Sequence, residues 1–161
     1  MRGVLAALSV AVAVGASAAA AGAATTTPGR APVGPAVLSG TAVQYLGDAQ
    51  AEDAAVERFD VSSQTWSART PTRAVAEVAA PLAVAMARVR HQLVTQHWPA
   101  ALRPDVAELA RRLVAPERDL RSPPLASAQV PGWLAVYRRD AGRVEPVANQ
   151  IRRQIGLARR D

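Results

Sequence analysis

Three observations predict an all-helical fold for this sequence of 161 residues. Apolar residues recur three and four positions apart along four stretches, which is the period of an amphipathic helix. Proline-rich and polar segments separate these stretches, and none of them alternates apolar and polar residues as a half-buried strand does. We therefore expect an up-down-up-down four-helix bundle with proline-kinked helices over residues 41–161.

The first 40 residues lie outside the expected bundle. Residues 1–23 combine a positive charge at Arg2, an apolar run and an A-x-A pattern ending at Ala23, which together predict a secretory signal peptide. Residues 24–40 are rich in threonine, proline and glycine, so we expect a flexible linker there. The alternative for the apolar run is an uncleaved membrane anchor, because about 20 residues can span a bilayer. The sequence thus predicts a protein that is secreted or held in the cell envelope.

The first two helices are expected over residues 41–59 and from Pro71 to about residue 97. Proline suits the first position of a helix, whereas Pro81 lies in the interior of the second helix and is expected to kink or split it. The apolar face of the first helix consists of Ala42, Tyr45, Leu46, Ala49, Val56 and Phe59. Asp53 falls on the same face.

Proline also marks the other two expected helices. The third helix opens at Pro104, and Pro116 is expected to bend or end it. The fourth helix is expected from Pro131 to about residue 159, with Pro146 inside it. Its apolar residues alternate spacings of four and three without interruption, as a bundle seam requires. They are Tyr137, Ala141, Val144, Ala148, Ile151, Ile155 and Ala158.

The first and last helices of the expected bundle carry opposite charges. Residues 41–60 contain five acidic residues and one arginine, whereas residues 131–161 contain seven arginines and three acidic residues. The first and last helices of an up-down bundle are antiparallel neighbours. We therefore expect these charges to favour that pairing over alternative arrangements.

Arginine supplies all 19 basic residues, against 13 acidic residues, for a formal net charge of +6. Export argues against nucleic acid as a partner, and the scattered aromatic residues do not form a base-stacking platform. We expect an envelope protein, an anionic lipid or a cell-wall polymer instead, with the membrane reached only peripherally or through an uncleaved signal. The residues expected to make this contact are Arg152, Arg153, Arg159 and Arg160. The plainer interpretation of these arginines is a solvated helix face.

No residue is assigned to catalysis, to a metal or to a cofactor. The chain has no cysteine, and the motifs G-x-S-x-G and H-E-x-x-H are absent. His91 and His97 are six residues apart, about 240° around a helix, so they cannot share a metal on one face. Asp53 on an apolar face requires a partner, which is either an arginine at the bundle edge or a bound ligand. The candidate ligand-binding residues are Asp53, Tyr45 on the same helix face, and His97 at the end of the second helix.

Two hypotheses for function follow from these features. The leading one is an exported, non-enzymatic helical bundle that binds a partner at the cell envelope. The alternative is a protein that binds a small apolar or amphipathic molecule in a cavity inside the bundle, beside Asp53 and the kinks at Pro81 and Pro146. An enzyme with a pair of carboxylates ranks third, because no catalytic motif supports it.

Overall fold

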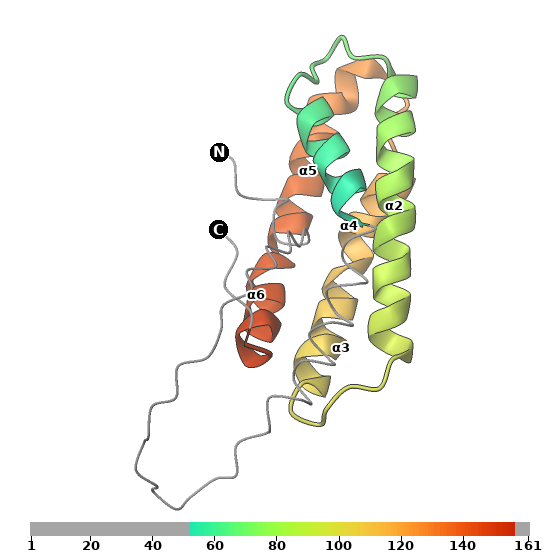
Figure 1. The fold of residues 1–161 in the computed structure, drawn as a ribbon. Coiled ribbons are helices and arrows are strands. Elements are labelled where there is room, and N and C mark those ends of the chain that lie inside the picture. The colour runs from blue at the N-terminus through green and yellow to red at the C-terminus, as the bar shows by residue number, and fades with distance from the viewer. Residues whose placement is uncertain (1–51, 157–161) are drawn as a thin grey trace, which may run out of the picture.

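The computed structural model describes residues 52–156, and these residues are all-helical (Figure 1). A helical segment over residues 52–63, called segment 52–63 below, opens the described part. It is followed by α2 (Thr72–Thr95), α3 (Arg103–Arg112), α4 (Val114–Arg121), the 3-10 helix η1 (Ser127–Gln129), α5 (Val130–Gly142) and α6 (Glu145–Gln154). The all-helical prediction is confirmed for these residues. The expected signal peptide, the linker and residues 41–51 of the first helix lie outside them.

Two of the expected helices are each divided in two, and proline accounts for both positions. α3 ends at Arg112, four residues before Pro116, and α5 ends at Gly142, four residues before Pro146. A proline ring clashes with the carbonyl four residues earlier and has no N–H to donate to it. Both prolines therefore lie in the first turn of a new helix, α4 or α6, where that N–H is not needed. The break before Pro116 agrees with the expectation that this proline bends or ends the third helix, whereas the expectation of one helix from Pro131 to about residue 159 across Pro146 is wrong.

Pro81 behaves differently, because α2 continues through it from Thr72 to Thr95. The carbonyl of Glu77 loses its helical hydrogen bond there. Pro81 and Glu77 are both exposed, so water can bind the freed carbonyl. The helix thus tolerates the proline on its outer side.

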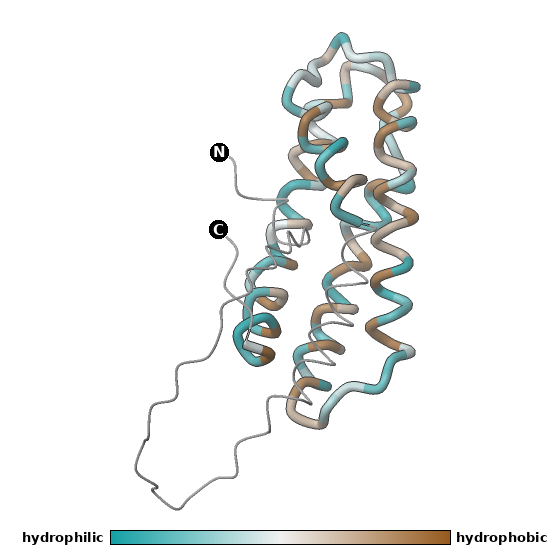
Figure 2. Tube along the Cα trace, viewed as in Figure 1, coloured by the Kyte–Doolittle hydropathy of each residue, from teal (hydrophilic) through white to brown (hydrophobic). Residues whose placement is uncertain are grey.

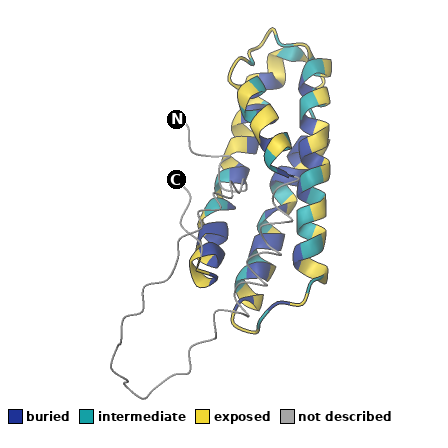
Figure 3. Cartoon of the chain, in the orientation of Figure 1, coloured by how far each residue is buried: buried dark blue, intermediate teal, exposed yellow. Residues whose placement is uncertain are grey.

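The core lies where the helices face one another. α2 packs along both α3 and α4, α4 also packs against α5, and α3 packs against α6. Figure 2 shows hydrophobic positions recurring along each helix, and Figure 3 shows buried and exposed positions alternating in the same way. The largest fully buried side chains are Tyr137, Phe59, Leu82, Met86, Leu109, Leu113, Leu120 and Ile151.

An aromatic cluster joins segment 52–63 to α5. The ring of Phe59 lies 4.9 Å from that of Tyr137 and 5.2 Å from that of Trp66, measured between centroids. Trp133 lies 6.1 Å from Trp66 and donates its indole N–H to the carbonyl of Asp119 at 2.9 Å. Such ring pairs stabilise a fold beyond the area they bury, by about 0.5–1.5 kcal/mol each. The cluster makes segment 52–63 and α5 neighbours.

Charge contributes less to this contact than the sequence predicts. Arg138 donates to the hydroxyl of Ser63 at 3.3 Å, and its charge acts on Asp60 to lower that pKa against the larger effect of burial, which raises it. Arg139 of α5 and Arg143, which directly follows that helix, instead pair with Asp140 of α5, at 2.9 Å and 3.5 Å. Aromatic packing therefore carries most of the contact.

A buried carboxylate connects α2 to α4. Glu117 is 5% exposed and binds Arg90 of α2 at 2.6 Å and Arg121 of its own helix at 2.9 Å. At the other end, Gln150 and Gln154 of α6 donate to Asp105 of α3 at 3.0 Å and 2.8 Å. These polar contacts fix α2 to α4 and α3 to α6.

Candidate functional site

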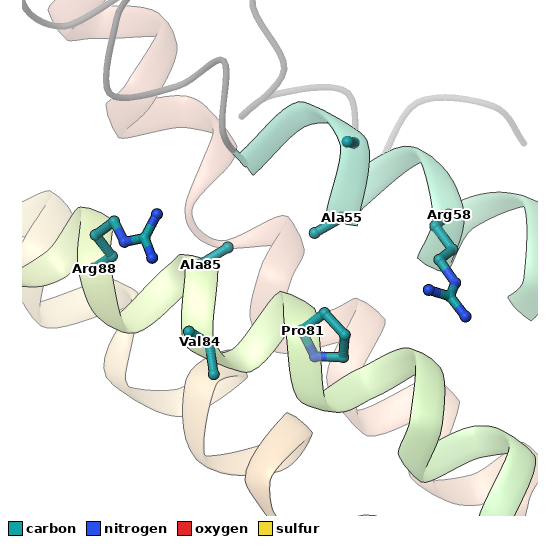
Figure 4. Close-up of a pocket in the computed structure, with 7 residues that line it drawn as sticks. Ala55, Arg58, Pro81, Val84, Ala85 and Arg88 are labelled. Atoms are coloured by element: carbon teal, nitrogen blue, oxygen red, sulfur yellow. The ribbon is translucent and has the colours of Figure 1, made fainter.

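An open groove runs between segment 52–63 and α2 (Figure 4). Its volume is about 470 Å³, and it is lined by Ala54, Ala55, Arg58, Pro81, Val84, Ala85 and Arg88. The lining residues of α2 recur at spacings of three and four, so they form one stripe along the helix. This stripe lies outside the buried residues of α2, which include Leu82 and Met86. The groove is therefore a surface feature between two helices, floored by small side chains.

Two arginines lie at opposite ends of this groove. Figure 4 shows Arg88 extending along α2 toward Ala85, and Arg58 extending from segment 52–63 toward α2 beyond Pro81. Both residues are exposed. Arg88 follows Pro81 by seven positions, which is about 10 Å along the axis of an α-helix. Arg58 and Arg88 thus lie at the two ends of an apolar floor, which extends for about 10 Å along α2.

Neither guanidinium has an ion-pair or hydrogen-bond partner among residues 52–156. Most other arginines in that part of the chain do have one, as Arg90 has with Glu117 and Arg112 with Glu108. The arginines without such a partner are Arg58, Arg69, Arg88 and Arg153. Two of these four bracket the groove. A free guanidinium is permanently charged and presents a planar fork of donors that fits a carboxylate.

A second pocket, of about 300 Å³, lies at the far end of α2. It includes His97, which is exposed, beside the buried Trp98. The pocket's one charged side chain, Arg103, donates to the carbonyl of Trp98 at 3.0 Å, and the indole of Trp98 donates to the carbonyl of Leu93. These polar groups serve the local fold, because they bond to the backbone of the pocket wall.

The structure places two of the predicted ligand-binding residues, Asp53 and His97, at different sites. Asp53 is half-buried on segment 52–63, next to Ala54 of the groove, whereas His97 lines the second pocket. Tyr45 lies outside the described residues. The expected cavity beside Pro81 and Pro146 differs as well, because Pro81 lines the open groove and Pro146 is exposed at the start of α6.

The expected arginine surface of the last helix also differs from the structure. Arg152 is only 8% exposed, and it interacts with other groups there. It follows Ala148 by four residues and adjoins Ile151, and both of these are fully buried, so its place on α6 is on the inward side. Arg153 is exposed, and Arg159 and Arg160 lie outside the described residues. The assignment of Arg152 to surface contact is therefore wrong.

Sequence reasoning missed Glu52, which takes the core position that it assigned to Asp53. Glu52 is 1% exposed, and neither of its carboxyl oxygens has a hydrogen-bond partner in the described structure. Burial, together with the charge of Asp53, raises the pKa of Glu52 to about 8. The hydroxyl of Tyr137 is likewise buried with no hydrogen-bond partner there, and burial raises its pKa well above the usual range. The signal for Glu52 is its spacing of four and seven from Val56 and Phe59.

Metal clusters and membrane-spanning helices are absent from the described residues, 52–156. Within residues 52–156, no group of three or more His, Asp or Glu side chains is placed to hold a metal ion. No helix among those residues is long and apolar enough to cross a membrane. Comparisons of the chain with protein-family models, curated proteins and solved structures found no match.

Proposed function

We propose that this protein acts by binding, without catalysis, and that it engages an acidic partner through the groove between segment 52–63 and α2. In this proposal the chain is exported by the signal peptide of residues 1–23 and works at the cell envelope. Residues 41–161 form an up-down-up-down four-helix bundle that serves as the scaffold. The partner is an acidic protein of the same compartment.

The observation that carries this proposal is the pair of free guanidinium groups on an apolar groove. Most other arginines of the described residues are already bound within the fold, so Arg58 and Arg88 are available to an outside carboxylate. An exposed ion pair is worth only about 0.2–1 kcal/mol. Affinity therefore requires apolar contact between the two charges, and the floor of Pro81, Val84 and Ala85 supplies it.

In this proposal the binding surface is the groove, and the arginines of the last helix are not part of it. The sequence suggests a surface of Arg152, Arg153, Arg159 and Arg160, but the burial of Arg152 removes one of its four members. The groove keeps the same chemistry, an arginine surface for an anionic partner, and adds a shape that a solvated helix face lacks. The alternative of a small-molecule cavity inside the bundle stays a prediction, since both described pockets lie at the surface.

Binding of fluorescent poly-L-glutamate to the full-length protein tests this proposal. We expect the double variant Arg58→Gln/Arg88→Gln to bind it about threefold to tenfold more weakly than the wild type, because two exposed charge contacts are lost. Affinity of the wild type should also fall as salt is added. Fluorescence anisotropy at low and high salt measures both effects.

The matched control is Arg69→Gln/Arg153→Gln, which removes the same charge from two exposed arginines that are also free but lie outside the groove. We expect it to bind poly-L-glutamate nearly as well as the wild type. Equal losses in the two double variants would show that only net charge matters, and the groove would then not be the binding site.

A further inference from the structure

We infer that the groove accepts an α-helix of the partner that carries two carboxylates two turns apart, at positions i and i+7, with small apolar residues between them. This inference rests on the proposed function and specifies the partner of the same site. It follows from the shape of the groove, from the length of its floor between Arg58 and Arg88, and from the absence of a suitable acidic segment in the chain itself.

The floor of the groove favours a helix over an extended peptide. Its residues between the arginines are alanine, valine and proline, which offer no side-chain donor or acceptor. An extended peptide would bring unpaired backbone N–H and C=O groups onto this surface, whereas a helix satisfies its own. Ala54, Ala55 and Ala85 are small, so a third helix can approach the two that form the groove. An amphipathic helix in an apolar groove is an established mode of recognition.

The same floor disfavours a bilayer as the occupant. Proteins that lie on membranes insert large aromatic and aliphatic side chains from a protruding face. Here Phe59 and Trp98 are buried and Trp66 is half-buried, and the groove presents Val84 as its largest exposed apolar residue. A flat lipid surface does not reach a recessed floor of alanine.

The length of the groove floor along α2 sets the spacing of the carboxylates. Arg88 lies two turns of α2 beyond Pro81, and Arg58 lies at the other end of the groove. On a helix that runs along the groove, residues i and i+7 fall on one face and are about 10 Å apart. Two carboxylates at these positions reach one guanidinium each, and positions i+3 and i+4 face the floor.

The chain does not contain a good occupant of its own groove. Residues 1–47 have no acidic residue, and residues 157–161 have only Asp161. Asp53 and Asp60 are the one acidic pair of this spacing in the sequence, and both are half-buried in the fold. A symmetric dimer through the groove would place the arginines of one copy against those of the other. The acidic helix therefore belongs to a different protein.

Two helical peptides of identical composition provide the test. Each has an alanine-leucine face and two glutamates, placed at i and i+7 on that face in one peptide and at i and i+9, on opposite faces, in the other. We expect the full-length protein to bind the i,i+7 peptide at least about tenfold more tightly, as measured by fluorescence anisotropy. This preference should disappear in Arg58→Gln/Arg88→Gln and persist in Arg69→Gln/Arg153→Gln. Circular dichroism confirms that each variant is folded.

The outcomes separate this inference from the proposed function. Equal binding of the two peptides, with poly-L-glutamate still dependent on Arg58 and Arg88, would overturn the helix and leave the acidic partner standing. If neither the peptide preference nor the binding of poly-L-glutamate depends on Arg58 and Arg88, both the helical partner and the proposed function are overturned. Binding to phosphatidylglycerol vesicles that needs the same two arginines, without a peptide preference, would assign the groove to a bilayer. A dimer in solution that Arg58→Gln/Arg88→Gln dissociates would assign it to a second copy of the chain.

Discussion

At the scale of single residues, Glu52 places an ionisable carboxyl in the core next to the buried Tyr137. Its carboxyl oxygens have no hydrogen-bond partner among the described residues, and burial holds its pKa at about 8, against an ordinary value of 4.5. The folded protein therefore keeps a proton on Glu52 that the unfolded chain releases between these two pH values. The free energy of unfolding must then fall as the pH rises through that interval.

We expect one such group to lower the free energy of unfolding by about 1.4 kcal/mol for each pH unit between pH 4.5 and pH 8. The contribution is fully present below pH 4.5 and is lost by pH 8. Glu52→Gln keeps the neutral shape of the side chain and should lack this slope. Urea unfolding of the variant and the wild type across that range measures the difference.

Glu57→Gln is the control for this experiment, because Glu57 lies on the same segment and is exposed. It should retain the pH dependence of the wild type. Stability curves of Glu52→Gln and the wild type that stay parallel from pH 4.5 to pH 8 would show that Glu52 is not a buried neutral acid.

Asp53 is the residue predicted for this position from the sequence, although the spacing alone does not distinguish Asp53 from Glu52. Positions 52 and 53 both fit the spacing of three and four that connects Ala49 to Val56. Asp53 stands out as a polar residue on an apolar face, yet the structure turns Glu52 inward. The two positions are only about 100° apart around a helix, so the packing of segment 52–63 against its neighbours determines which of them is buried.

At the scale of elements, proline position determines which helices continue. Pro116 and Pro146 begin new helices, and each preceding helix ends four residues earlier. Pro81 lies inside an unbroken α2. The sequence shows where these prolines are and that each disturbs a helix. Whether a helix breaks or continues depends on how its two halves pack against the rest of the fold. The local sequence does not determine this packing.

We expect Pro81→Ala to raise the stability of the protein, by about 1–3 kcal/mol, because alanine restores the N–H and removes the ring from a helix interior. Pro146→Ala should change stability by less than about 1 kcal/mol, since its position in the first turn of α6 needs no N–H. Thermal unfolding of both variants checks the contrast. Equal effects at the two sites would contradict the account of the helix breaks.

At the scale of the whole molecule, all-helical architecture was predictable and the surface was not. Periodicity identifies the buried side of each helix, because burial imposes it. The groove forms from residues on the outer side of α2 and from segment 52–63, and it exists only once these two helices are placed side by side. The free state of Arg58 and Arg88 likewise depends on where every other charge lies. The sequence alone does not show which arginines are free, so the clustered arginines of the last helix were the candidates for partner binding.

The connection between α2 and α4 through Glu117 should be important for the stability of the whole fold. We expect Glu117→Gln to lower the free energy of unfolding by about 1–2 kcal/mol, because it weakens two charge-assisted hydrogen bonds to a buried group. Glu77→Gln, which disrupts the exposed pair with Arg73, should cost less than about 0.5 kcal/mol. Guanidinium unfolding measures both, and comparable losses would show that burial of Glu117 adds nothing.

The aromatic cluster also has an optical consequence. Trp66 and Trp133 lie together at the start of α2, and Trp98 follows its other end. α2 has 24 residues, so it separates the two ends by about 36 Å. Indoles 6.1 Å apart couple their electronic transitions and give an exciton circular-dichroism signal, which a lone indole cannot give. The circular dichroism of the coupled pair therefore reports on one end of α2, and Trp98 reports on the other, without any added label. Together the two signals distinguish local unfolding of one end from loss of the entire fold.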